Sequence, residues 1–314
     1  MNWFLQKLKS LLINNWFNNN ELKQINESFN NSVYSYWDFF IKINTKPDWL
    51  FLEYEYNILK SIENRFAPKS LFYWDFIHDD IRYYILVLQK LDWRNIDYEW
   101  NNLSNNEKGS LIKDIVTIVK QINSYKHEDF DFERKKYDLA QNIEYNYKLM
   151  QTNPLLDKFK TDNLYKDFMN LKEHINNSNC YLIHNDLWYK NILANDWKLS
   201  GIIDFEISIF APKEFELFKI LHHRISAQNY IENWWVDYTE IEFMEMLLKE
   251  ISVNYEEIYQ YSNIVEEFYL YNVNTYFQRL TRYNEDWYRQ GEVENFCDKI
   301  CDLDRCRDLL NSLK

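Results

Sequence analysis

Two short polar motifs, each placed directly after an apolar run, constrain the fold of this chain more than any other feature. Residues 184–191 read H-N-D-L-W-Y-K-N, and the run Tyr181–Ile183 ahead of them has the composition of a β-strand. Thirteen residues after the first motif ends, Asp204 stands in the tetrapeptide I-D-F-E, and a second apolar run, 199–203, leads into it. We therefore predict that both motifs follow short strands.

The part of the chain before residue 92 is predicted to form a small, mostly antiparallel sheet with one helix. Its strand candidates are rich in aromatic and β-branched residues, and Asp38 marks a turn between the first two. The stretch 48–64 carries apolar residues at helical spacing. The four predicted strands are 33–37, 39–43, 70–76 and 83–88.

From about residue 105 the apolar pattern becomes helical. Helices are predicted at 111–122, 133–151 and 161–176, and again throughout the chain after Pro212. The length of 314 residues is enough for two lobes. We place their boundary after the last N-terminal strand, which predicts lobes at residues 1–92 and 93–314.

Composition excludes several classes of protein. Hydrophobic residues make up 46% of the chain and allow a sizeable core, but aromatics alone are 18%, so buried Tyr and Trp will need hydrogen-bond partners. A net charge of −13 argues against a nucleic-acid partner. Residues 1–13 have apolar residues at helical spacing, and their lysines interrupt any secretory-signal core. No stretch is long enough to span a bilayer, and a packing helix is favoured over a membrane-surface helix.

The four cysteines give weak support for a metal site. They are Cys180, Cys297, Cys301 and Cys306, and no C-x-x-C pair occurs among them, so the pattern of a zinc site is missing. The roles of the last three stay open. Without a secretory signal, reduced thiols and a cytoplasmic location are expected.

The two motifs resemble the signature of protein-kinase-like small-molecule kinases. These are the aminoglycoside phosphotransferases and the choline and ethanolamine kinases, whose signature is H-[GN]-D-[LF]-x-x-x-N followed by I-D-[FW]-[EG]. Here the two parts read H-N-D-L-W-Y-K-N and I-D-F-E. The resemblance implies an α+β, bilobal protein-kinase-like fold, with an N-terminal nucleotide-binding lobe of antiparallel sheet and one helix, and a mainly helical C-terminal catalytic and substrate-binding lobe. It spans residues 22–290 and is specific only around 180–217.

The resemblance also implies roles for individual residues. Asp186 matches the catalytic base, and Asn191 and Asp204 match the ligands of Mg²⁺, an ion that prefers oxygen donors. Lys42, in F-F-I-K-I, matches the lysine that pairs with the phosphates of ATP or GTP, and Glu55 matches the helix glutamate that positions it.

Two neighbouring residues qualify these assignments. Glu53 competes with Glu55 but would lie on a different helix face. His184 is expected to hold its loop by hydrogen bonding rather than to take part in chemistry, because phosphoryl transfer already has its base and its metals.

The chain departs from the family pattern in two places. The first hairpin of the family often contains glycine, but the segment 27–34 has none, so Ser28 or Ser32 is expected to contact phosphate instead. Asn31 and Tyr34 still match the N-x-x-Y of that hairpin. Beyond the second motif, Glu216 stands where the family usually has a structural aspartate.

The acceptor is expected to be a small molecule. Helices at 105–176 lengthen the stretch between Lys42 and Asp186 relative to protein kinases, as in the small-molecule family. The C-terminal stretch 255–289 is crowded with aromatics and carboxylates, which favours a cationic amine such as an aminoglycoside, choline or ethanolamine, although aromatic core packing explains the same composition. The alternative is a catalytically weak pseudokinase that acts as a binding module.

Overall fold

The computed structural model describes most of the chain outside its N-terminus. The described residues are 23–25, 31–45, 51–62, 66–78, 80–91, 94–132, 136–152, 158–176, 179–231, 238–258, 262–282 and 300–313. The expected helix at 1–13, Ser28 and Cys297 lie outside these ranges. No helix among the described residues is both long enough and apolar enough to cross a bilayer.

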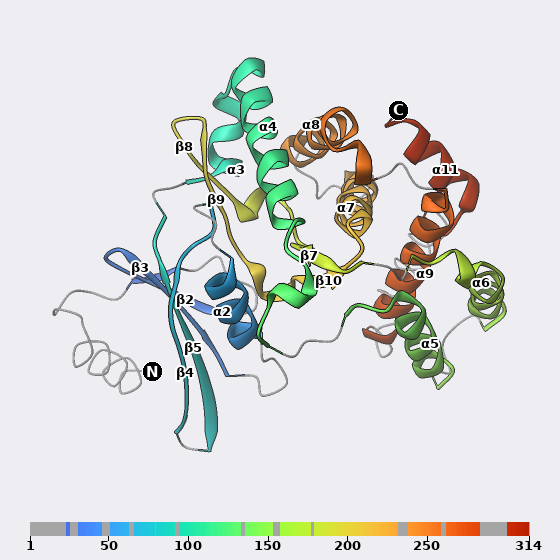
Figure 1. Cartoon of the computed structure of the whole chain (residues 1–314), viewed down its shortest axis with the longest axis horizontal. Helices are drawn as coiled ribbons and strands as arrows, with labels where there is room; N and C mark the ends of the chain where they lie inside the picture. The colour runs from blue at the N-terminus through green and yellow to red at the C-terminus, as the bar shows by residue number, and fades with distance from the viewer. Residues whose placement is uncertain are drawn as a thin grey trace. The chain divides into compact units, whose positions relative to one another are not determined.

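The chain divides into two compact units (Figure 1). The first contains the described residues up to Arg94 together with two later segments, 193–195 and 200–207. The second contains the rest. The functional division into a nucleotide-binding lobe at 1–92 and a catalytic lobe at 93–314 stays a prediction, and the structure adds that the loop around Asp204 belongs to the first unit.

The first unit is built on a five-stranded antiparallel sheet in the order β1-β2-β3-β5-β4. The four strands that the sequence predicted are present, and a short additional strand, β1, pairs with β2 at the edge. The strands are β1 (Lys23–Ile25), β2 (Ser32–Tyr36), β3 (Phe39–Asn44), β4 (Ser70–His78) and β5 (Ile81–Gln89). Helix α2 (Phe51–Ser61) contacts β4 and β5, so the predicted helix is also present.

The alternation of side chains along β3 decides what faces the helix. Ile41 and Ile43 are buried in an apolar cluster with Tyr34 and Tyr36 of the neighbouring strand. Because successive residues of a strand point to opposite faces, Lys42 between them points to the other face of the sheet. That face carries α2, and the fold thereby directs a buried lysine toward the helix.

Three short strands form a separate sheet, and the last of them leads into the second motif. Strands β8 (Ile192–Asn195) and β9 (Lys198–Ile202) pair with each other, and β6 (Arg94–Asn95) pairs with β8. The strand predicted ahead of Asp204 corresponds to β9, whereas β8 was not predicted. Gly201 in β9 lies where a Cβ atom would approach the Phe66 carbonyl oxygen to 2.9 Å, so only glycine fits there without a shift.

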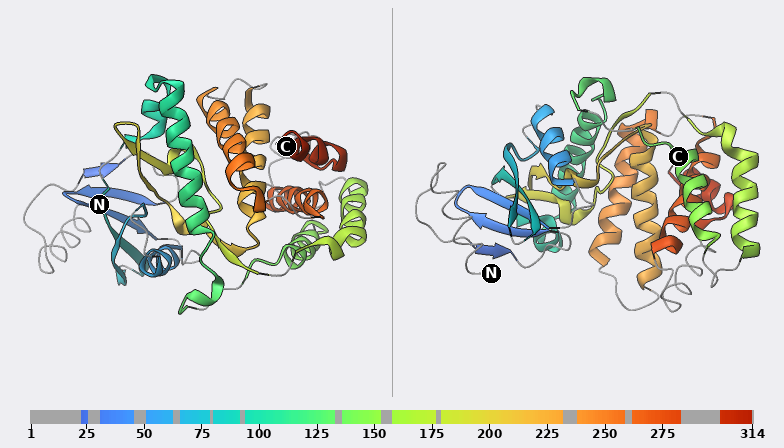
Figure 2. Two further views of the ribbon diagram at one scale, coloured as in Figure 1. Left: turned by 45° about the horizontal axis from the view of Figure 1, so that its top comes forward. Right: turned by 90° about the horizontal axis from the view of Figure 1, so that it is seen from below.

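The second unit is mainly helical, as predicted. A two-stranded antiparallel sheet of β7 (Tyr181–Ile183) and β10 (Ile209–Ala211) holds the first motif, and β10 was not predicted. The helices are α3 (Ile96–Glu99), α4 (Asn105–Ile122), α5 (Leu139–Met150), α6 (Lys158–Leu171), α7 (Glu214–Ile231), α8 (Tyr238–Asn254), α9 (Ile264–Arg282) and α11 (Leu303–Asn311). Helix α9 contacts α5, α6, α7 and α11, and α7 lies beside α8 (Figure 2).

Aromatic side chains fill much of the core of the second unit, and two of them hydrogen-bond to acidic side chains. The Trp100 ring packs edge-on against Phe243 at 5.4 Å between centroids, and its Nε1–H donates to Glu242 at 2.8 Å. The hydroxyl of Tyr269 donates to Asp167 at 2.8 Å. A buried aromatic with a satisfied polar atom keeps its apolar stabilisation without the cost of an unpaired group.

Candidate active site

A buried lysine bridges two carboxylates in the first unit. The Lys42 Nζ donates to both oxygens of Glu55, at 2.9 and 2.8 Å, and to Asp204 Oδ1 at 2.7 Å. The Lys42 side chain is 12% exposed and that of Glu55 is fully buried, whereas Asp204 is 34% exposed. The structure thus brings together three predicted site residues that are far apart in the sequence, and leaves one carboxylate open to solvent.

The geometry also decides between the two candidate glutamates of α2. Glu55 faces the sheet and reaches Lys42, whereas Glu53 is exposed. Glu55 Oε1 in addition accepts the backbone N–H of Phe205 at 3.3 Å. The helix glutamate therefore holds both the lysine and the backbone of the loop that carries Asp204.

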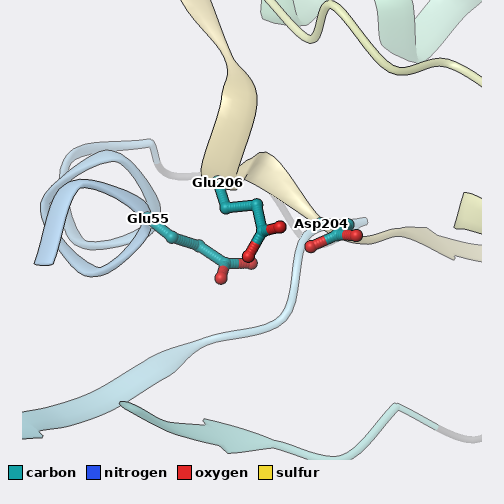
Figure 3. Close-up of side chains that lie close together, drawn as sticks. All are labelled: Glu55, Asp204 and Glu206. Atoms are coloured by element: carbon teal, nitrogen blue, oxygen red, sulfur yellow. The ribbon is translucent and has the colours of Figure 1, made fainter. Parts of the chain in front are cut away.

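Three carboxylates converge on this point from α2 and from the loop after β9. Figure 3 shows Glu55, Asp204 and Glu206 with their carboxylates turned toward one another, and one oxygen of each lies within 4.8 Å of the others. Lys42 supplies one positive charge to these three groups. Hard oxygen donors at this spacing and an excess of negative charge suit Mg²⁺, so the residues fit that ion.

The charged groups of the cluster shift one another's pKa. Burial lowers the pKa of Lys42, but Asp204 and Glu55 outweigh this effect and hold the pKa above its usual value, so the ammonium stays charged. Burial raises the pKa of Glu55, and Lys42 opposes that shift. A metal cation at Asp204 would relieve the remaining repulsion among the carboxylates.

The backbone at Asp204 is held in an uncommon conformation. Its φ is +72°, in the left-handed region that side chains other than those of glycine, asparagine and aspartate rarely adopt. Such conformations persist where the surrounding contacts enforce them, and they cluster at functional sites. Here the conformation presents the Asp204 carboxylate to Lys42.

The glycine-free first hairpin is tied to the same loop through amide side chains. Asn31 Nδ2 donates to Glu206 Oε2 at 2.6 Å, and Asn44 Nδ2 donates to Asn31 Oδ1 at 3.0 Å. Both asparagines and Glu206 are buried. The sequence marked Asn31 as part of N-x-x-Y and Glu206 as part of I-D-F-E without linking them. Ser32 is exposed, and its contact with phosphate stays a prediction.

In the second unit, the loop of the first motif is held by hydrogen bonds around Asp186. The Nδ2 group of Asn191 donates to the Asp186 carbonyl oxygen and to its Oδ2, each at 2.9 Å. The Asp186 N–H faces His184 Nδ1 at 3.3 Å. His184 is fully buried, and its backbone N–H donates to Glu216 Oε2 at 2.8 Å.

These contacts agree with the expected structural parts of the motif. His184 anchors the loop, and Glu216 accepts a hydrogen bond from the loop backbone, whereas its replacement of the family's structural aspartate stays a prediction. Burial raises the pKa of Glu216, and the loop backbone opposes that shift. Asn185, between the histidine and the base, has a φ of +62°, which explains why the family has glycine or asparagine at this position.

The stretch 255–289, whose composition favoured a cationic acceptor, forms what we call the C-terminal wall, and several of its described aromatics and carboxylates are buried in the core. Tyr271 and Tyr276 are buried, and Glu267 is fully buried. Burial and the nearby Glu214 raise the pKa of Glu267 to about 9, so this group is neutral at pH 7 and cannot attract a cation. The residues 283–288 of the same stretch lie outside the described ranges.

Comparison with known proteins identifies relatives of this architecture. The sequence model of a family described as the phosphotransferase enzyme family matches residues 21–247. A search of curated protein sequences finds no significant match.

Several solved structures share the fold. The aminoglycoside phosphotransferase APH(4)-Ia, as a thermostable mutant with AMP-PNP and hygromycin B, has a TM-score of 0.66 at 12% identity, over 94% of this chain and 97% of that one. APH(2")-IIia with GDP and kanamycin has a TM-score of 0.63 at 15% identity, over 93% and 97%. The GDP complex of aminoglycoside 2'-phosphotransferase-IIIa has a TM-score of 0.63 at 13% identity, over 98% and 99%. The predicted α+β, protein-kinase-like fold is confirmed.

Proposed function

Because the chain belongs to the phosphotransferase enzyme family, we propose that it transfers the γ-phosphate of ATP or GTP to a hydroxyl of an amine-bearing small molecule. The acceptor would be of the aminoglycoside type or of the choline and ethanolamine type. The observation that carries the proposal is the lysine bridge from Lys42 to Glu55 and Asp204. In kinases the lysine–glutamate pair and the metal-binding aspartate must both be in place for transfer.

One set of residues is proposed to serve the donor nucleotide and its metal ion. Lys42 is proposed to pair with the phosphates, and Glu55 holds it in position through two hydrogen bonds. Asp204 and Asn191 are proposed to hold Mg²⁺, with Glu206 near enough to Asp204 to share in the site. Bound there, the ion would neutralise charge on the transferring phosphate oxygens.

The second unit supplies the groups for the acceptor. Asp186 is proposed to orient the acceptor hydroxyl and to receive its proton as the oxygen bonds to phosphorus and the nucleoside diphosphate leaves. The Asn191 amide holds Asp186 Oδ2 at 2.9 Å. This leaves Asp186 Oδ1 as the atom that meets the hydroxyl.

The preference for an amine rests on charge and on the relatives. The chain has a net charge of −13. Two of the similar structures contain kanamycin and hygromycin B, which carry amines. The described part of the C-terminal wall supports the preference less than its composition suggested, because Glu267 and the neighbouring tyrosines are buried.

A pseudokinase is not favoured. A binding module would not need a buried lysine bridging two carboxylates, since buried charges are costly unless they are paired. It would also not need an aspartate held by an asparagine of the same loop. The sequence also retains all five polar residues of the signature, which are Lys42, Glu55, Asp186, Asn191 and Asp204.

Substitution of the base tests the proposal. Phosphoryl transfer from Mg·ATP and Mg·GTP should be measured with kanamycin, hygromycin B, choline and ethanolamine as acceptors, and with glucose as a neutral comparison. Asp186→Asn should lower turnover roughly 100-fold or more, as loss of a positioned base does. Asp114→Asn, the same change at an exposed position of α4, is the matched control and should keep wild-type turnover.

The two parts of the proposal fail differently. Wild-type turnover in Asp186→Asn refutes the role of the base. A panel in which glucose outperforms every amine refutes the amine preference and leaves the phosphotransferase assignment intact. The preference should weaken but persist at high salt, because partly buried charges are screened less than exposed ones.

A further inference from the structure

One polar atom beside Asp186 has no hydrogen-bond partner among the described residues. His223, on α7, has a buried Nε2 without such a partner. That atom lies 3.9 Å from Asp186 Oδ1, too far for a hydrogen bond and near enough for a small shift to close the gap. Buried polar atoms are normally paired, so an unpaired one beside a reactive carboxylate calls for an explanation.

The contact involves Asp186 Oδ1. Among the described residues, the motif loop supplies no side-chain donor to this oxygen. Asn191 binds Oδ2, whereas His223 faces Oδ1. The two donors approach the carboxylate from different elements, the motif loop and α7. A carboxylate held from both oxygens has a defined plane, and a defined plane fixes the direction from which a hydroxyl can approach.

Packing against an aromatic ring holds the imidazole in place. Its ring stacks against that of Trp188, with centroids 6.3 Å apart and planes inclined by 27°. The Trp188 Nε1 atom is also buried without a partner among the described residues. The Trp188 ring also contacts Lys190, whose Nζ lies 4.8 Å from the ring centroid.

The surroundings keep this histidine neutral. Burial lowers the pKa of His223 well below its ordinary value, and the cations Lys219 and Arg279 lower it further. His222, the adjacent residue, is already engaged by Asn272 and Arg279. A neutral imidazole can donate one N–H to Asp186 without forming an ion pair that would pin the carboxylate.

We infer that His223 is a positioning residue for the catalytic base, which donates its Nε2–H to Asp186 Oδ1 when substrates bind. The inference rests on the proposed role of Asp186 in phosphoryl transfer. Hydrogen bonds of catalytic groups are often long without substrate and shorten in the reactive complex. With Asn191 on one oxygen and His223 on the other, the free lone pair of Oδ1 faces the acceptor hydroxyl.

Substitutions at His223 separate a positioning role from a structural one. His223→Leu and His223→Phe remove the donor and keep an apolar side chain of similar size. Their turnover should fall about 10- to 100-fold, the effect of losing a hydrogen bond to a charged group, while the KM for Mg·ATP changes little. His223→Gln restores an N–H near the Nε2 position and should recover most of the turnover.

Thermal unfolding supplies a readout that needs no acceptor. Because an unpaired buried polar atom is costly, the better tolerated of the Leu and Phe variants should unfold at the wild-type temperature or above it. His222→Gln is the matched control on the same helix, and it breaks formed hydrogen bonds. It should unfold at a lower temperature and keep its turnover.

Turnover is measured with Mg·ATP and the amine panel, and as hydrolysis of Mg·ATP by water. The inference is overturned if both apolar variants keep wild-type turnover, or if all three His223 variants unfold at lower temperatures. Asp186→Asn is assayed in parallel. If that variant alone is inactive, only the role of His223 fails; if it stays active, the proposed function fails with it.

Discussion

Removal of Lys42 should destabilise the first unit strongly and in a pH-dependent way. Its ammonium contacts Glu55 at 2.8 Å and Asp204 at 2.7 Å, and its side chain is 12% exposed. With an effective dielectric constant of about 20, one such contact corresponds to about 6 kcal/mol of Coulomb energy before desolvation. Desolvation cancels much of that gain, but Lys42→Met leaves the buried carboxylate of Glu55 without its cation. We expect a loss of about 3–5 kcal/mol in the free energy of unfolding at pH 8.5.

The pH dependence of this stability loss follows from the Glu55 carboxyl group, which stays buried when Lys42 is removed. Burial raises the pKa of Glu55 in the folded chain, and Lys42, which opposes the shift, is gone in the variant. A group whose pKa is raised on folding binds more protons in the folded state, so stability falls as pH rises above its unfolded pKa. Lys42→Met should therefore lose less stability at pH 5.5 than at pH 8.5.

A double-mutant cycle isolates the pair. Glu55→Gln removes the buried charge, so Lys42→Met/Glu55→Gln should be more stable at pH 8.5 than Lys42→Met alone, with a coupling of about 2 kcal/mol. Lys108→Met is the matched control. The partner of Lys108, Glu242, is 43% exposed and can be hydrated, so Lys108→Met should lose less free energy of unfolding than Lys42→Met.

The free energy of unfolding of all four variants is measured by urea unfolding, with tryptophan fluorescence as the signal. The reasoning is refuted if the double variant is no more stable than Lys42→Met at pH 8.5. It is refuted equally if Lys42→Met has the same stability deficit at both pH values.

Three further substitutions test the backbone and the metal site. Asp204→Ala should abolish Mg²⁺-dependent binding of ATP and GTP in calorimetric titrations, and an unchanged affinity would contradict its role as a ligand. Asn185→Ala should cost about 1 kcal/mol of stability at a φ of +62°, whereas Asn185→Gly should be tolerated; equal losses would show that the conformation is unimportant. Gly201→Ala should cost about 1–3 kcal/mol, since its Cβ would clash with Leu91 Cδ1 and lie 2.9 Å from the Phe66 carbonyl oxygen; wild-type stability in urea would exclude this clash.

The sequence by itself determined the parts of this protein that depend on neighbours along the chain. Alternation in F-F-I-K-I placed Lys42 on the face opposite Ile41 and Ile43, and helical spacing separated Glu55 from Glu53. The motifs marked Asp186 and its loop. The placements of Lys42 and Glu55 follow from the periods of strand and helix, which are local properties that a few consecutive residues already define.

Only the tertiary structure decided which distant groups meet. Nothing in the local pattern joins Asn31 to Glu206, or His223 to Asp186, because each pair is brought together by the packing of separate elements. The surroundings of Glu267 in the C-terminal wall also depend on the packing of separate elements. Composition shows that stretch 255–289 is aromatic and acidic, but whether Glu267 faces a ligand or the core depends on what packs against α9, and burial there leaves it neutral at pH 7.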